Sequence, residues 1–509
     1  VKDGVYSACL TNFKCTDPTK DIWMAVSVEV KSDFANYTAY SAPIRIECAN
    51  RVPKGECSAA QNTLSDARSQ WKTAGGPDDP IAARDATIAW LKQQTNVADA
   101  GPSSGNGNGI WIQYKAGFLG ALNLNPAGYR GGAMGASENA MNMLSKHAAS
   151  ANTPFNTHTI NSKKALVLAP YWNEFSQDGF DEATEIASLL ENSSCPTFNV
   201  NGAKSNSEAS LAAFRSQYLY GVVAVTSHGD AYFNGIDNKF KQSLDWDHQG
   251  SQEVIWTGEK VNCNALTTSN QSCNAAPEPG QACPAGKNCC SNGQECVITG
   301  AQGTSLSGVC VDRTQMDMRK GRVIMGDDTW GISSTFVSRH AKIRMPNSLV
   351  YLGSCRSLHV GTLAAEYLAS GAKAIAGYSG YISSEFASNS GAAFFENMLT
   401  NQDLTGSAFF KVEPQEDPQN KGEIFRLFGA TNLDIMNADL INPSFESSDL
   451  TGWNRDGDGR VIAQLGISIP VHGKFMGLIS TGLGFTVQTG EIFQNFCIPG
   501  DKTSMQFYW

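Results

Sequence analysis

Short apolar runs alternate with segments of helical spacing between residues 164 and 400, and this alternation limits the possible folds more than any other feature. The apolar runs are ALVLAP (165–170), YGVVAVTSHGD (220–230), SLVYLGSC (348–355) and AKAIAGYSG (372–380). Segments such as DEATEIASLLEN (181–192) lie between them and carry one apolar face. Nearly continuous apolar strands joined by helices predict a mostly parallel sheet with helices on both faces.

The chain has 509 residues, which is enough for several domains. We predict an N-terminal β-sandwich over 1–60, a mixed α/β linker or pro-region over 61–163 and a central α/β domain over 164–440. The linker region is expected to contain a helix over 79–94 with Asp79 as its cap, a flexible loop over 101–109 and a β-hairpin over 110–124. PTFNVNG (196–202) is expected to be a further strand of the central domain. A disulfide-rich insertion occupies about 231–345 of the central domain. Residues 441–509 are expected to begin a C-terminal jelly-roll β-sandwich that continues beyond the given sequence.

The 14 cysteines indicate an oxidising compartment, so a secreted or cell-surface protein is expected. No apolar run approaches the length of a membrane span. The four cysteines before residue 60 are expected to form two disulfides, with three possible pairings. The segment 273–310 holds six cysteines and few large apolar residues, so it needs disulfides to fold. Zinc is disfavoured, because the adjacent pair Cys289 and Cys290 has no histidine nearby in sequence.

Two of the predicted strands end in residues with reactive side chains. VVAVTSHGD ends in His228 and Gly229, and LVYLGSC ends in Cys355. Because the carboxyl ends of parallel strands meet at one edge of a sheet, an imidazole and a thiol are expected side by side there. An imidazole can convert a thiol into the nucleophilic thiolate. The backbone N–H groups of Gly229 and Cys355 could then hold the oxyanion of a tetrahedral intermediate.

Each of these residues also has a structural interpretation. A histidine at a strand end is more often structural, and a cysteine among thirteen others is more often part of a disulfide. His359 follows Cys355 closely and is a rival general base, although a solvated or capping role is the simpler interpretation. His340 is expected to be exposed. Cys195 is the candidate for a second reduced cysteine, because removing Cys355 leaves an odd number.

The ordered set of motifs resembles the caspase–gingipain clan of cysteine peptidases. The stretch LVYLGSCRSLHVGTLAAEYLASGAKAIAGYSGYIS is especially similar to gingipain-type and CHAT-domain members. The resemblance covers roughly residues 164–400 without the insertion. It implies a caspase-like α/β core, with His228 as general acid/base, Cys355 as nucleophile and Gly229 at the oxyanion site.

Some members of the clan cleave after arginine or lysine and line the pocket with acidic residues. Glu385 and Asp230 are the candidates for such a specificity pocket here, although a charge favoured by the dipole at a helix N-terminus is the simpler interpretation of Glu385. The segment NRDGDG (454–459) could hold a structural calcium through Asp456 and Asp458, although a simple turn is the alternative. The chemistry itself needs no cofactor.

The sequence thus predicts a secreted cysteine endopeptidase that forms an acyl-enzyme on a protein or peptide substrate. The alternative is a catalytically silent caspase-like scaffold or adhesin whose terminal β-modules bind carbohydrate at a cell surface. The net charge is −10 and the sequence contains no basic stripe, which argues against nucleic acid as a partner. The segment DMRKGRVIM (317–325) is expected to be an exposed basic loop, at which cleavage would activate a zymogen.

Overall fold

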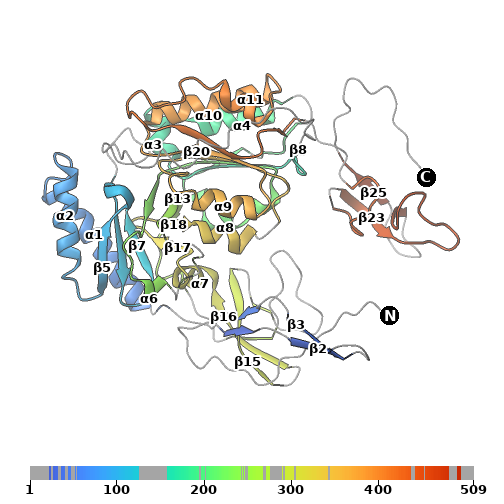
Figure 1. Ribbon diagram of the computed structural model, residues 1–509, viewed down its shortest axis with the longest axis horizontal. Helices are drawn as coiled ribbons and strands as arrows, with labels where there is room; N and C mark the ends of the chain where they lie inside the picture. Colours follow the sequence, from blue (N-terminus) through green and yellow to red (C-terminus); the bar gives the residue numbers. More distant parts are fainter. Residues whose placement is uncertain are drawn as a thin grey trace.

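The computed structural model contains two large sheets and several small ones (Figure 1). It describes the strand segments of residues 22–46, then residues 54–124, 158–193, 197–200, 202–241, 250–266, 271–274, 289–290, 293–302, 305–341, 344–436, 442–451, 453–480 and 490–494, together with residues 52, 244 and 246.

The first large sheet has six strands in the order β10-β9-β11-β19-β20-β21. They are β10 (Ala203–Ser205), β9 (Ala165–Ala169), β11 (Val222–Thr226), β19 (Leu349–Gly353), β20 (Ala374–Tyr378) and β21 (Phe425–Gly429). All neighbours are parallel except β20 and β21. Every residue of the four central strands is buried, which explains their unbroken apolar sequences. The predicted, mostly parallel sheet is therefore confirmed, although β10 begins after the segment 196–202 in which a strand was expected.

Helices cover both faces of this sheet, as predicted. Figure 1 shows α4 (Glu182–Glu191), α10 (Ser384–Leu399) and α11 (Thr405–Phe410) on one side of β20, with α8 (Ser334–Ala341) and α9 (Thr362–Ala369) on the other. Successive strand residues point to opposite faces. Val222 accordingly belongs to the core beneath α4 and α10, whereas Val223 belongs to the core beneath α8 and α9.

The second large sheet has seven strands in the order β12-β13-β18-β17-β7-β6-β5. They are β12 (Gly229–Tyr232), β13 (Gln252–Lys260), β18 (Thr329–Ser333), β17 (Val323–Met325), β7 (Leu119–Leu122), β6 (Ile110–Tyr114) and β5 (Val97–Pro102). The expected hairpin over 110–124 is present, with Ile110 opposite Leu122. Strands from the predicted linker region and from the predicted insertion thus share one sheet.

Two helices precede this sheet in the chain. The predicted helix is α2 (Pro80–Leu91), and Asp79 caps it by accepting a hydrogen bond from the N–H of Ala82 at 3.1 Å. Helix α1 (Lys54–Thr73) buries a narrow stripe of small and apolar residues. The sequence analysis did not predict this helix, because most of its residues are polar. The loop over 101–109 was expected to be flexible, which is wrong: Ser103 and Asn108 are buried.

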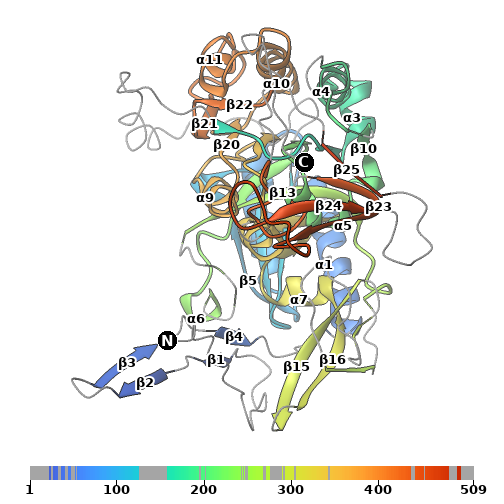
Figure 2. The ribbon, with the colours of Figure 1, turned by 90° about the vertical axis from the view of Figure 1, so that its right-hand side faces the viewer.

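Disulfides hold the cystine-rich segment together. Cys273 pairs with Cys296 and Cys290 pairs with Cys310 across a small sheet of β14 (Ser272–Cys273), β16 (Ser305–Asp312) and β15 (Gln294–Gln302). Figure 2 shows β15 and β16 extending away from the large sheets. Cys57 was expected to pair within the first sixty residues, but it is bonded to Cys263 beyond β13. The other three N-terminal cysteines and Cys195 lie outside the described residues.

The described strands near the two ends form small sheets. At the N-terminal end, β1 (Ile22–Met24) pairs with β4 (Ile44–Ile46), and β2 (Ser27–Lys31) pairs with β3 (Asn36–Tyr40). At the C-terminal end, β23 (Asn454–Ile462) lies between β24 (Met476–Ser480) and β25 (Gly490–Phe493). Both ends therefore contain β-structure, and their assembly into sandwiches stays a prediction.

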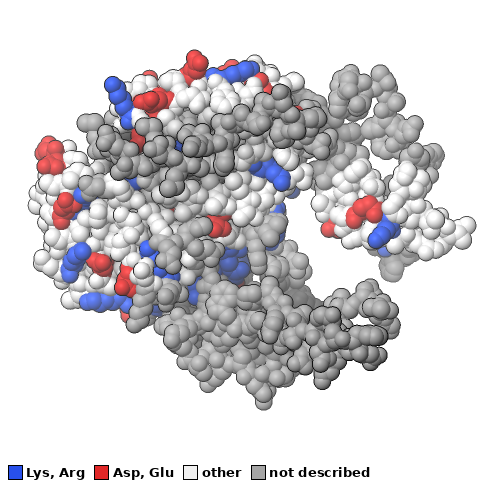
Figure 3. Space-filling view, viewed as in Figure 1, with Lys and Arg blue, Asp and Glu red and all other residues white. Residues whose placement is uncertain are grey.

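The described surface and helices bear on possible partners. On the face drawn in Figure 3, basic and acidic side chains are interspersed over the coloured residues, without a continuous basic patch among them. In the described part of the chain, none of the helices combines the length and the hydropathy that a membrane span requires.

Candidate active site

His228 and Cys355 follow neighbouring parallel strands, as the sequence pattern indicates. Thr226, the last residue of β11, lies opposite Gly353, the last residue of β19, and the N–H of Ser227 donates to the carbonyl of Gly353 at 3.1 Å. The two segments then run on at the same edge of the sheet. Their catalytic roles stay predictions, and the side-chain contacts described next bear on them.

Cys355 keeps a reduced thiol and is fully buried. Its Sγ accepts a hydrogen bond from the N–H of Ile382 at 3.0 Å and lies 3.5 Å from the carbonyl oxygen of the same residue. Ile382 follows β20, so the sulfur contacts the side of the site next to that strand.

His228 makes its contacts on the other side, with the segment that follows β9. Its ring lies edge-on to Tyr171 at 4.4 Å and to Phe175 at 5.2 Å between centroids. Its Nε2 lies 3.1 Å from Oε1 of Glu174, on the short helix α3 (Trp172–Gln177). The imidazole is therefore held from the β9 side and the thiol from the β20 side.

Glu174 is a candidate functional residue that the sequence analysis missed. It follows β9 at the same sheet edge as His228 and Cys355, and this position was the available signal. A carboxylate on Nε2 fixes the orientation of the imidazole ring. Nδ1 is then the nitrogen that would act toward a substrate or a nucleophile.

A cavity of about 420 Å³ opens beside His228. Aromatic side chains and three carboxylates contribute to its lining: Tyr171, Trp256, Glu174, Asp327 and Asp328. The cavity borders the segments after β9 and β11, where the strand order reverses direction. Open α/β sheets generally bind their ligands at this position, outside the carboxyl ends of the strands.

Asp230 is not among the residues that line this cavity, and its charge is paired inside the protein. Its carboxylate accepts a hydrogen bond from Nη1 of Arg356 at 2.7 Å, and both side chains are almost fully buried. The hydroxyl of Tyr381 also donates to it. Because Arg356 already pairs with the carboxylate of Asp230, this charge has a structural role and is not offered to a substrate.

Glu385, the other candidate for the specificity pocket, lies in the first turn of α10 and is exposed. Its carboxylate accepts a hydrogen bond from the side-chain amide of Gln419 at 3.2 Å. An acidic residue in the first turn of a helix is stabilised by the helix dipole, as the simpler interpretation stated.

His359, the rival general base, has a fixed structural role. Its Nε2 lies 2.6 Å from Nη2 of Arg356, and its Nδ1 lies 2.7 Å from the carbonyl oxygen of Ser379. Arginine only donates and a carbonyl only accepts, so Nε2 must accept and Nδ1 must carry the proton. Burial, together with the charge of Arg356, lowers the pKa of His359 to about 3. This neutral, doubly bonded ring is unsuited to proton transfer.

Glu253 holds the turn between Cys355 and α9. Its carboxylate accepts hydrogen bonds from the N–H groups of Val360, Gly361 and Leu363 at 2.7 to 2.8 Å. Burial raises the pKa of Glu253, and the hydrogen bonds oppose that shift. The residue comes from β13 of the second sheet, so it ties the loop after Cys355 to that sheet.

The predicted exposed basic loop at 317–325 is wrong. These residues form the end of α7 (Arg313–Arg319) and the strand β17, and both Lys320 and Arg322 are buried. His340, also expected to be exposed, is buried with its Nε2 3.0 Å from Asp317. A protease cannot reach these positions in the native fold.

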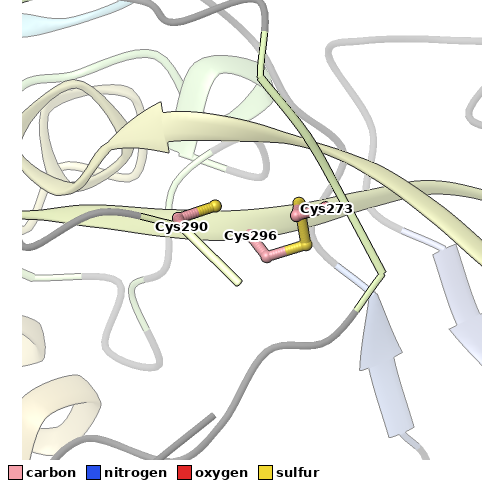
Figure 4. A group of neighbouring side chains, drawn as sticks. All are labelled: Cys273, Cys290 and Cys296. Atoms are coloured by element: carbon pink, nitrogen blue, oxygen red, sulfur yellow. A yellow bond between two sulfur atoms is a disulfide. The ribbon is translucent and has the colours of Figure 1, made fainter. Parts of the chain in front are cut away.

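Two groups of residues carry side chains of the types that ligate metal ions. Cys273, Cys290 and Cys296 place their sulfur atoms within 4.8 Å of one another (Figure 4), but each belongs to a disulfide and offers no thiolate. The proposed calcium residue Asp458 lies in β23, not in a turn, and its carboxylate is bonded to Arg460 and Ser480. The side chain of Asp456 lies outside the described residues.

Comparisons of the chain with family models, with curated proteins and with solved structures returned no match. The functional argument therefore rests on the residues and geometry of this chain.

Proposed function

We propose that the protein is a cysteine endopeptidase with a core like that of the caspase–gingipain clan. The observation that carries the proposal is the placement of His228 and Cys355 after adjacent parallel strands, with Glu174 on the imidazole. Nδ1 of His228 takes the proton from Sγ of Cys355. The thiolate attacks the peptide carbonyl, and the N–H groups of Gly229 and Cys355 stabilise the resulting oxyanion.

The rest of the cycle uses the same groups. The imidazolium returns its proton to the leaving amine, the C–N bond breaks and a thioester remains on Cys355. A water molecule then attacks the thioester and gives its proton to His228. The carboxylic acid leaves as the C–S bond breaks, and the thiol regains its proton. Glu174 keeps the ring oriented throughout and stabilises its protonated form.

The cavity beside His228 supports a preference for a basic residue before the scissile bond. Glu174, Asp327 and Asp328 contribute carboxylates, while Tyr171 and Trp256 offer aromatic faces for an aliphatic stem or a guanidinium. This location replaces Glu385 and Asp230 as the proposed seat of specificity. Asp328 is the better candidate for contact with a substrate, because its side chain is 69% exposed and its ion pair with Lys260 is long, at 3.6 Å. Asp327 is less exposed and pairs with Arg68, which also lines the cavity.

Complete burial of Cys355 favours the alternative of a silent scaffold, because reactive cysteines are usually partly accessible. Under the peptidase proposal, substrate reaches Sγ only after local movement of the residues that cover it. Hydrolysis of a peptide library separates the two functions. The peptidase proposal expects turnover that is lost in Cys355→Ala and in His228→Ala. Turnover that persists in Cys355→Ala would refute it, and absence of turnover in the wild type would favour the scaffold.

A further inference from the structure

A buried ion pair joins the two segments that carry the proposed catalytic residues. Asp230 lies two positions after His228, and Arg356 follows Cys355 directly. Nη1 of Arg356 lies 2.7 Å from Oδ1 of Asp230, with side-chain exposures of 3% and 0%. The pair therefore links the backbone after β11 to the backbone after β19 at a point next to both reactive side chains.

The guanidinium of Arg356 also contacts other parts of the site. Nη2 donates to the carbonyl of Ser104 at 2.7 Å and to Nε2 of His359 at 2.6 Å, while Nη1 lies 3.2 Å from the hydroxyl of Tyr381. Tyr381 directly precedes Ile382, whose N–H binds the sulfur of Cys355. One side chain thus connects the His228 segment, the Cys355 segment and the segment that holds the thiol.

The backbone at Arg356 has an unusual conformation. Its φ is 52°, in the left-handed region that non-glycine residues rarely adopt. Such strain persists only where surrounding contacts determine the conformation, and it occurs often at functional sites. The contacts of the guanidinium provide that determination here.

Gly229 shows how closely the two segments approach. A Cβ atom at this position would lie 2.7 Å from the carbonyl oxygen of Cys355 and 3.0 Å from Oγ of Ser354. A larger side chain has no room here, so the two backbones lie against each other next to the ion pair.

We propose that the Asp230–Arg356 pair is a positioning clasp that sets the location of His228 relative to Cys355. The inference rests on the proposed peptidase function and extends it to two residues that do not touch substrate. A buried ion pair adds little net stability compared with apolar residues. Stability alone therefore does not explain the pair, whereas a role in fixing the position of His228 relative to Cys355 does. Arg356→Lys keeps the charge but replaces the planar fork that reaches several partners at once.

The chain offers a matched control. Arg322 is equally buried and pairs with Asp317 at 3.4 Å, but it directly precedes β17 and its partner lies on α7, outside the two segments that carry His228 and Cys355. We expect Arg356→Lys to lower kcat by about 100-fold with KM changed less than about threefold, because small displacements of reacting groups cost about this much. Arg322→Lys should keep kcat within about threefold. Both are measured on the full chain at a temperature where near-ultraviolet circular dichroism shows native packing.

A milder variant covers the case in which Arg356→Lys does not fold. Tyr381→Phe removes one hydroxyl that donates to Asp230. We expect kcat to fall by about tenfold, because His228 and Cys355 are displaced less than in Arg356→Lys. A folded Arg356→Lys or Tyr381→Phe variant with kcat within about threefold of the wild type would overturn the clasp. An equal loss of kcat in Arg322→Lys would also overturn it, because the effect would then be general.

A second measurement separates the clasp from the proposed function. If the wild type hydrolyses no peptide, the proposed function fails, and the pH dependence of Cys355 alkylation by iodoacetamide still tests the clasp. We expect the pH midpoint of the alkylation rate to rise in Arg356→Lys toward the ordinary thiol value of about 8.5, as the imidazole moves away. Arg322→Lys should leave the midpoint unchanged. The same midpoint in Arg356→Lys and in the wild type would refute the clasp.

Discussion

Cysteines in two regions of this protein have opposite roles, and their surroundings explain the difference. In the cystine-rich segment, Cys273, Cys290, Cys296 and Cys310 form disulfides, and these cysteines make up the local core cluster among the side chains that the structure describes there. In the six-stranded sheet, Cys355 lies within a large apolar core and keeps its thiol. Where the core is small, sulfur supplies the stability. Where the core is complete, no disulfide is needed and the thiol stays reduced.

The largest effect is expected from Cys355→Ala. Peptide hydrolysis should fall by at least about 10⁴-fold, because the nucleophile is lost. The free energy of unfolding should fall by only about 1 kcal/mol, since one sulfur atom is removed from a buried site. Turnover with a fluorogenic peptide and urea unfolding measure the two quantities. If activity survives, Cys355 is not the nucleophile and the contrast between the two regions disappears.

Removal of the Cys290–Cys310 disulfide should give the reverse pattern. With both residues changed to Ala, the opening free energy of β15 and β16 should fall by about 3 kcal/mol, as expected for a closed loop of this size. Hydrolysis should stay within about twofold of the wild type. Hydrogen exchange of the strand amides measures the first effect. A loss of turnover in this variant would mean that the cystine-rich segment takes part in the reaction.

Acid should weaken the core around Cys355 through His359. The folded-state pKa of His359 is about 3, below the ordinary value of 6.5. Below pH 6.5 the unfolded chain binds a proton that the folded chain excludes, so stability falls as the pH drops from about 6.5 toward 3. The slope contributed is up to about 1.4 kcal/mol per pH unit.

The matched variant for this prediction is His359→Gln, which removes the titrating group. The free energy of unfolding of this variant should be lower at neutral pH. Between about pH 6.5 and 3 that free energy should fall less steeply than in the wild type, by an amount that corresponds to at most about one proton taken up on unfolding. Urea unfolding at several pH values gives both slopes. Equal slopes in the two proteins would show that His359 is not excluded from protonation in the native state.

The smallest effect concerns Glu174. Glu174→Gln keeps a hydrogen bond to Nε2 of His228 but removes the charge, and we expect kcat to fall by about tenfold, within the range by which such positioned groups assist proton transfer. Glu185→Gln is the control, because Glu185 is an exposed carboxylate on the neighbouring helix α4 and should leave kcat unchanged. An unchanged kcat in Glu174→Gln would limit Glu174 to a structural role.

Local patterns predicted the fold of the central sheet well. Unbroken apolar runs such as 165–170 and 349–353 identify strands buried on both faces, and these strands are present. The second large sheet escaped prediction, because its strands come from residues 97–122 and 229–333 and pair over long sequence distances. Alternation within one strand carries no information on which distant strand becomes its neighbour.

The candidate site was predicted in part for the same reason. Strand ends identified His228 and Cys355, since the position of each follows from its own strand. The partners of Asp230, His359 and Arg322 depend on tertiary contacts that local patterns do not contain. Asp230 was therefore a candidate for the specificity pocket, Arg322 was expected in an exposed loop, and His359 was expected to be solvated or capping, with general base as the rival role. Glu174 could have been found, because it follows β9 at the same edge of the sheet.

Affinity labelling tests the central claim most directly. A peptidyl chloromethyl ketone that ends in arginine is incubated with the full chain, and the modified residue is identified by mass spectrometry. The account predicts one adduct, on Cys355, that forms at least about 100-fold more slowly in His228→Ala, in line with the contribution of a general base. A wild-type protein whose Cys355 stays unlabelled, or a His228→Ala variant labelled at the wild-type rate, would contradict it.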